Sequence, residues 1–189
     1  MAQPTYNQTL GLIRLAGVYL AIGALVVGAR PSPLGVTAGV LLVALGQALR
    51  VWASGHLIKN VSLITSGPYR YTRNPLYLGR LLIFAGLCVM ARLPYGLNWL
   101  LLLTGCAVFF GYYLPRKERV EPARLSALHG ESFERYRREV PALWPTTKRY
   151  HRDGRGRWSA ALARDNREHW MIAGLVAVTL YLFWRAYSP

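Results

Sequence analysis

The residues of this chain that could do chemistry gather in a polar stretch between two apolar runs, Thr65 to Gly79, which reads TSGPYRYTRNPLYLG. It concentrates glycine, proline, tyrosine and arginine where a connector between membrane helices need only be short and polar. The residue before a proline is disfavoured in the helical conformation, so Asn74 is predicted to be the last non-helical position and Pro75 to open a helix. The exposed amides of a helix start, with Arg73 beside them, can receive a carboxylate or a phosphate. The stretch is therefore a candidate binding site.

All eight acidic residues lie downstream of that stretch, between Glu118 and Glu168. Any carboxylate that balances a cationic ligand must therefore come from this later segment. The two cysteines, Cys88 and Cys106, sit inside apolar runs, where a free cysteine behaves as a small hydrophobe. Neither a disulfide framework nor a metal site is predicted.

The elements that must position these residues are membrane helices. Hydrophobic residues make up 53% of the 189 positions, with six Trp and 12 Tyr, which is high for a soluble domain of this size. Five apolar runs predict membrane helices at 10–29, 34–53, 75–91, 95–115 and 170–187. The first is expected to be retained rather than cleaved as a signal peptide. The uninterrupted part of the last, 170–184, is short of the about 20 residues that a span needs, so whether it crosses the bilayer stays open.

Between the fourth and fifth runs lies a charged segment, 116–168, the only part that looks soluble. It is predicted to hold two short helices separated at Gly130, which suits a helix-ending position. The expected fold is therefore an all-α integral membrane protein. It has about five transmembrane or membrane-embedded helices plus short cytoplasmic helices, in a single domain over 1–189.

The basic residues indicate an orientation. Segment 116–168 holds 14 Lys and Arg, and the connection before the third run adds Lys59, Arg70 and Arg73. The opposite side would carry only three, Arg30, Arg92 and Arg185. The positive-inside rule therefore places the Thr65–Gly79 stretch and segment 116–168 together in the cytoplasm, with the N-terminus also inside. We expect the membrane to be the cytoplasmic membrane of a prokaryote.

The net charge of +15 raises two non-enzymatic alternatives. No nucleic-acid partner is expected, because the basic residues follow a membrane face and form no recognisable nucleic-acid module. A membrane scaffold whose arginines hold lipid phosphates stays open. Against it stand Gln47, Arg50 and Arg80, which lie within spans, because polar and ionisable residues there are costly and usually mark a functional cavity.

The two polar segments together resemble a known family. The sequence TSGPY at 65–69, followed by RNPLYLG at 73–79, looks like the Gly-Pro-Tyr and Arg-His/Asn-Pro-x-Tyr-x-Gly motif of the isoprenylcysteine carboxyl methyltransferases, whose relatives include the phospholipid N-methyltransferases. A second motif of that family is matched by Glu121, Leu125, Gly130, Phe133, Tyr136, Val140 and Pro145. The similarity covers roughly 45–146, and paired motifs are more specific than either alone.

This resemblance implies an integral membrane methyltransferase that uses S-adenosylmethionine on the cytoplasmic side, while a lipophilic substrate arrives from the bilayer with membrane lipid as a partner. The cationic amino group and sulfonium of the cofactor suit Glu121 and aromatic faces, and its carboxylate suits Arg73 or helix-start amides. Gly79 would allow close approach. The candidate cofactor-binding residues are Tyr69, Arg73, Asn74, Pro75, Tyr77, Gly79, Glu121 and Tyr136.

Departures from the family pattern keep several points open. Asn74 stands where the family often has a histidine and cannot titrate, so it is not expected to be a general base. Glu121 is followed by Pro122 rather than a second acid, so Glu118 could share or replace its role. Phe133 and Tyr136 could instead be packing residues.

The acceptor also stays open between O-, N- and S-methylation. The spans lack acids that could serve as a base, which favours a carboxylate acceptor such as an isoprenylcysteine. The catalytic candidates that could hold its charge are Arg80, Arg137 and Arg50. A membrane reductase of sterol-reductase type that uses NADPH is a further alternative, and oligomeric state is not indicated.

Overall fold

The computed structural model of the chain describes residues 20, 23, 26–58, 63–150 and 156–188, so most of the predicted 10–29 span lies outside the described residues. The longer helices are α2 (Pro33–Ser54), α3 (Pro75–Ala91), α4 (Leu97–Val108), α5 (Leu114–Glu139), α6 (Ala160–Asp165) and α7 (Glu168–Tyr187). Short turns complete them: η1 (Gly67–Arg70), η2 (Pro94–Gly96) and η3 (Phe109–Tyr113). Every regular element in these ranges is helical, which confirms the predicted fold class.

Helices α2 and α3 pack closely because a glycine of one helix faces a glycine of the other at two points along their contact. A Cβ on Gly46 would lie 2.6 Å from the carbonyl oxygen of Gly79, and one on Gly86 would lie 2.7 Å from that of Gly39. Small residues let helix backbones approach in a membrane, where van der Waals packing replaces the hydrophobic effect as the driving force. The pair therefore forms the most tightly packed part of the described fold.

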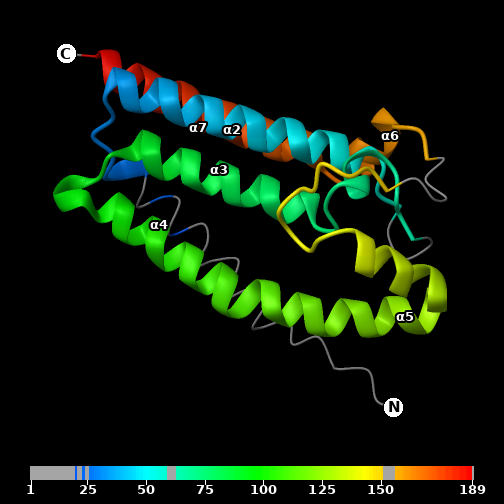
Figure 1. Cartoon of the computed structure of the whole chain (residues 1–189). Helices are drawn as coiled ribbons and strands as arrows, with labels where there is room; N and C mark the ends of the chain where they lie inside the picture. The colour runs from blue at the N-terminus through cyan, green and yellow to red at the C-terminus, as the bar shows by residue number, and fades with distance from the viewer. Residues whose placement is uncertain (1–19, 21–22, 24–25, 59–62, 151–155, 189) are drawn as a thin grey trace.

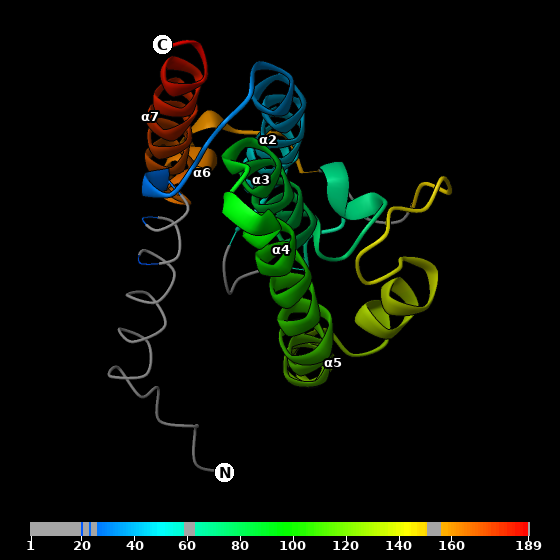
Figure 2. The ribbon, with the colours of Figure 1, turned by 90° about the vertical axis from the view of Figure 1, so that its left-hand side faces the viewer.

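Helix α7 packs on α2, which in turn packs on α3 (Figure 2). Leu182 of α7 is fully buried in the same cluster as Met90 and Cys88 of α3. The other buried members are Ala29, Val36, Val43, Ile83, Leu87 and Ala91. The C-terminal helix is thus part of the main core.

Among the described residues, three helical stretches are long and apolar enough to cross a membrane: Pro33–Ser54, Pro94–Pro122 and Glu168–Tyr187. Helix α3 is apolar but shorter, at 17 residues. Helix α7 has 20 residues, which is long enough to span a bilayer, although its uninterrupted apolar part, 170–184, is shorter than that. The chain is therefore a membrane protein.

The helix expected to end at Pro115 continues through it. Helices α4 and α5 follow each other through the π turn η3 as one long rod that diverges from α3 (Figure 1). In an α-helix a proline ring clashes with the carbonyl four residues earlier. Here the wider π turn stands directly before Pro115, with the Leu114 amide donating to the Phe109 carbonyl five residues back. Within α5, Gly130 has non-helical backbone angles (φ 51°, ψ −128°), and the helix bends there.

After this bend the chain returns as a loop, 140–150, that packs against the connection between α2 and α3 (Figure 1). Three backbone hydrogen bonds join them: Arg73 N to Pro141 O (2.9 Å), Thr146 N to Tyr71 O (2.9 Å) and Tyr150 N to Arg70 O (3.2 Å). The two polar segments that the sequence placed on one membrane face are therefore folded together.

Candidate functional site

Asn74 is the residue on which the two segments meet. It occupies the position before α3, with Pro75 as the first helical residue, and it is only 3% exposed. Its amide nitrogen donates to the Glu118 carboxylate at 2.9 Å and to the Ala142 carbonyl at 2.8 Å. Its amide oxygen accepts a hydrogen bond from Lys117. One side chain thus ties α3, α5 and the returning loop together.

Glu118 is held from both sides. One carboxylate oxygen accepts from Asn74, and the other pairs with the Arg73 guanidinium at 2.7 Å. Arg73 also donates through its Nε to the Val140 carbonyl at 3.0 Å. Since charge-assisted hydrogen bonds are the strong ones, this carboxylate is fixed in place, and each of its oxygens keeps a further acceptor site.

Cations surround the ring of Tyr77, one turn into α3. The Lys117 ammonium lies 4.4 Å from the ring centroid and the Arg80 guanidinium 5.5 Å, within the range of cation–π attraction. Lys117 also pairs with Glu121 at 2.8 Å, whose side chain is about half exposed. The Phe109 ring of η3 stands 6.2 Å from Tyr77. The π turn therefore closes an aromatic wall beside the charged groups.

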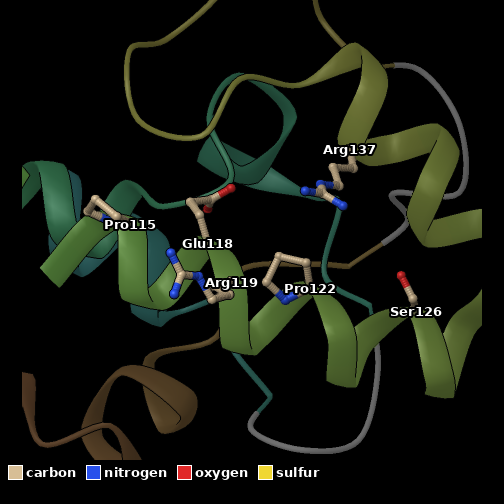
Figure 3. A pocket seen from close by; sticks show the side chains of 6 residues that line it. All are labelled: Pro115, Glu118, Arg119, Pro122, Ser126 and Arg137. Carbon is tan, nitrogen blue, oxygen red and sulfur yellow. The ribbon is translucent and has the colours of Figure 1, made fainter. Parts of the chain in front are cut away.

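A pocket of about 470 Å³ opens beside Glu118 (Figure 3). It is lined by Pro115, Glu118, Arg119, Pro122, Ser126 and Arg137. Arg137 comes from the part of α5 beyond the Gly130 bend, whereas the other five come from the part before it. The pocket exists because α5 folds back on itself, and its charged groups are two arginines and one glutamate.

Two predicted cofactor residues, Tyr69 and Tyr136, are instead packed against protein. Tyr136 is 3% exposed, its hydroxyl donates to the Tyr69 carbonyl at 2.7 Å, and its ring meets Tyr150 edge-on. Burial raises the pKa of both phenols well above the usual range, so the hydroxyls stay protonated. With Phe133, these residues hold α5 to the Thr65–Gly79 stretch.

Arg50 and Gly79 belong to a junction between helices. A Cβ on Gly79 would lie 2.5 Å from Cγ of Arg50, so the space above this glycine is occupied by the arginine side chain. The Arg50 guanidinium pairs with Glu168 of α7 at 2.6 Å. Sequence reasoning missed Glu168, although it is the last acid of the chain and directly precedes an apolar run, where an intramembrane arginine finds a partner.

The buried side chain of His56 packs against the start of the Thr65–Gly79 stretch. Its Nδ1 lies 3.1 Å from the Ser66 hydroxyl, and both side chains are buried. Gly67 adopts φ +57°, and a Cβ there would run into the His56 ring. Burial lowers the pKa of His56 from its ordinary value of 6.5. Only glycine suits this position.

The predicted residues thus fall into three groups. Those brought together around the Asn74 junction are Arg73, Asn74, Pro75, Tyr77, Arg80 and Glu121, with Arg137 across the neighbouring pocket. Those in the packing cluster are Tyr69 and Tyr136, and those in the helix junction are Arg50 and Gly79. Lys117 and Glu168 were not predicted. In the described ranges, no three His, Cys, Asp or Glu side chains lie together as metal ligands would.

Comparison with known proteins identifies the segment that carries this junction. Residues 34–118 match the model of a family described as phospholipid methyltransferase. The chain is also 33% identical over 138 residues to the cobalt-zinc-cadmium resistance protein CzcN of Cupriavidus metallidurans. That alignment covers 72% of this chain and 60% of the relative's length. No solved structure matches the chain.

The matched region begins at α2 and ends on Glu118, so it contains the first motif and the first part of α5 but not the second motif. The family expected from the sequence and the family found by comparison agree. Residues 34–118 of the chain are thus similar to the phospholipid methyltransferase family.

Proposed function

We propose that this protein is an S-adenosylmethionine-dependent methyltransferase of the membrane, which acts on a lipophilic acceptor as isoprenylcysteine carboxyl methyltransferases do. The observation that carries the proposal is the fixed Glu118 carboxylate at a pocket that also presents Arg119 and Arg137. The cofactor has a cationic end and an anionic end, so it needs this combination of charges.

The pocket suits the cofactor in size as well as in charge. Its volume of about 470 Å³ falls within the range of about 300–1,000 Å³ typical of small-molecule sites. Glu118 would face the amino group and sulfonium, and Arg119 or Arg137 would hold the carboxylate. Glu121 does not line the pocket, so of the two glutamates we favour Glu118. The aromatic wall of Tyr77 and Phe109 is linked to the pocket-lining helix by Lys117, the neighbour of Glu118 in the sequence, which lies over the Tyr77 ring.

The cofactor supplies an activated methyl group on sulfur. Transfer to an acceptor is an in-line displacement in which charge is dispersed, so the protein contributes mainly positioning and exclusion of water. Asn74 and Arg73 would keep Glu118 in place throughout, and neither needs to change protonation state. No residue of the junction is assigned as a general base.

The acceptor would reach the site from the bilayer, past the aromatic wall. Arg80 is exposed, lies on α3 over the Tyr77 ring, and has no acidic partner among the described ion pairs. It is therefore our candidate for holding the anionic group of a carboxylate acceptor. Arg50 is not, because Glu168 and the Leu76 carbonyl occupy its donors. The name of the CzcN relative concerns metal resistance and specifies no acceptor.

The proposal predicts that S-adenosylhomocysteine, the product of the methyl donor, stabilises the purified protein in detergent. We expect its midpoint of thermal unfolding to rise with ligand concentration, as it does whenever a ligand binds only the folded state. NADPH should cause no shift. Glu118→Gln keeps an acceptor for Asn74 but loses the charge, and should weaken binding by about tenfold or more.

Two matched variants serve as controls. Glu131→Gln removes an exposed carboxylate that pairs only with Arg135, and should leave affinity unchanged. Glu121→Gln should have a smaller effect than Glu118→Gln. A wild-type protein that responds to NADPH but not to S-adenosylhomocysteine would favour the reductase. A response to neither ligand would favour the scaffold.

A further inference from the structure

Helix α7 contributes a buried carboxylate at the end of the helix packing where α2 ends and α3 begins. Glu168 is 3% exposed, and its two oxygens accept from Arg50 Nη2 at 2.6 Å and Arg50 Nε at 3.2 Å. Gln47, one turn earlier on α2, donates to the same carboxylate at 3.4 Å. Both partners of the ion pair are buried, with side-chain exposures of 7% and 4%. The carboxylate therefore receives three donors from one helix.

The third arm of the Arg50 fork points to a different helix. Its Nη1 donates to the Leu76 carbonyl, in the first turn of α3, at 3.2 Å. Leu76 is the residue between Pro75 and Tyr77, and Gly79 leaves room for the arginine stem to lie flat across α3. Glu168 fixes two arms of the guanidinium, and because the group is planar and rigid, the direction of the third arm is fixed as well.

The chain before Glu168 is arranged to place it there. The Asn166 amide donates to the carbonyl of Ser54, the last residue of α2, at 3.0 Å and to the Leu57 carbonyl just beyond it at 3.1 Å. Arg167 then takes the left-handed conformation (φ 61°), which is uncommon for a residue with a side chain. Backbone strain of this kind persists only where the surroundings enforce it. Here it turns the chain so that the first residue of α7 faces inward.

We propose that Glu168 is a positioning residue, which fixes the first turn of α3 and thereby Tyr77 through the guanidinium of Arg50. It does not line the pocket beside Glu118. Because Tyr77 and Asn74 flank the fixed turn, the C-terminal helix takes part in shaping the candidate site although it lies outside residues 34–118. This inference rests on the proposed function for the identity of the ligand that the site binds. The positioning of α3 by Arg50 and Glu168 does not depend on it.

A plain charge-balancing role for Glu168 makes a different prediction for Arg50→Lys. Lysine keeps the positive charge beside Glu168, but an ammonium on a flexible stem lacks the planar fork that reaches Leu76 at the same time. If the pair only neutralises an intramembrane arginine, lysine should serve nearly as well. If the pair positions α3, lysine should fail at the first turn while it preserves the overall fold.

The experiment compares Arg50→Lys, Glu168→Gln and the control Asp165→Asn in the full chain in detergent. Asp165, three residues before Glu168, is exposed and loses the same charge in the control. Hydrogen exchange read by mass spectrometry reports the first two turns of α3 directly, because local opening governs exchange of their amides. Thermal unfolding and affinity for S-adenosylhomocysteine are measured on the same samples.

For Arg50→Lys we expect exchange in the first turns of α3 to be faster by about tenfold, with a thermal midpoint near wild type and weaker ligand binding. Glu168→Gln should lose both stability and protection, and Asp165→Asn should lose neither. If Arg50→Lys does not fold, Glu168→Asp, which moves the carboxylate but keeps its charge, replaces it in the same comparison.

Unchanged exchange at α3 in a folded Arg50→Lys or Glu168→Asp protein would overturn the inference. A wild-type protein that ignores S-adenosylhomocysteine, together with faster α3 exchange in the variant, would refute the proposed function and leave the positioning role standing. The two ideas therefore fail separately.

Discussion

His56 is a buried imidazole at the start of the Thr65–Gly79 stretch, held beside Ser66 and against Gly67. Desolvation disfavours its charged form, which is why its pKa falls below 6.5. In the unfolded chain the same side chain binds a proton near pH 6.5. Between the folded and unfolded pKa values, the unfolded state therefore holds more protons, and stability rises with pH.

This sign gives a testable pH dependence. We expect the free energy of unfolding to be highest above pH 6.5 and to decrease as the pH falls through and below that value. His56→Gln keeps a polar side chain of similar size that does not titrate, and should flatten the decrease. Chemical unfolding in detergent from pH 5 to pH 8 measures both proteins. An equally steep decrease in the variant would assign the effect to other groups.

For single residues, the sequence predicted which residue types form the candidate site. It predicted only some of the side chains that they contact. Asn74, Arg73 and Tyr77 were singled out from a local motif, and the structure brings them together. The choice between Glu118 and Glu121 could not be made, because it depends on the helical phase of α5 through Pro115 and Pro122. Lys117 could not be singled out in advance, because it is one of 14 basic residues in segment 116–168.

Among the elements, the contact between α2 and α3 depends on glycine. Gly79 was predicted to admit the cofactor, and in the structure a side chain of α2 fills that space. A sequence motif marks where a backbone must be approached closely, but it does not say by what. Such an approach by a neighbouring helix leaves the same pattern as one by a ligand.

Gly46→Ala tests this packing. Its Cβ would lie 2.6 Å from the Gly79 carbonyl and 2.9 Å from Ile83, contacts that force the helices apart. We expect a loss of about 1–3 kcal/mol, as for other overpacked interiors. Gly174→Ala in α7 is the matched control, since its Cβ would meet nothing within 4 Å.

The control should be neutral or stabilising by up to about 1 kcal/mol, because alanine is the better helix former. Thermal unfolding in detergent compares the two. If Gly46→Ala is as stable as Gly174→Ala, the close crossing is not a source of stability.

The bounds of α2 and α3 follow from sequence signals that are local, a serine cap before Pro33 and a proline at the first turn of each helix. The continuous α4–α5 helix could not be predicted from such local signals. Two prolines and an abrupt change from apolar to charged residues indicated a break at Pro115, whereas the π turn accommodates the first proline. A change in composition marks a change of environment, and a helix can pass through it.

For the molecule as a whole, the arrangement places the Asn74 junction and the pocket at one end of the helix bundle (Figure 1). The turn between α3 and α4 lies at the other end, with Tyr95 fully exposed in it. Those basic residues of segment 116–168 that the structure describes belong to the first end, which we propose faces the cytoplasm.

Cysteine labelling in intact cells tests this orientation. In a chain carrying Cys88→Ala and Cys106→Ala, a membrane-impermeant thiol reagent should label Tyr95→Cys and spare Arg138→Cys, an exposed position on the pocket side. After permeabilisation both should react. Labelling of position 138 alone in intact cells would invert the proposed topology.

The ion pair between Arg50 and Glu168 also has a consequence for biogenesis. The two residues are 118 positions apart, so at synthesis rates of about 5–20 residues per second the arginine precedes its partner by about 6–24 seconds. Throughout that interval α2 carries an unneutralised charge within its last turns, where the side chain can extend to the membrane surface. Insertion of α2 and its final packing are thus separate events, and the second waits until the start of α7 has been synthesised.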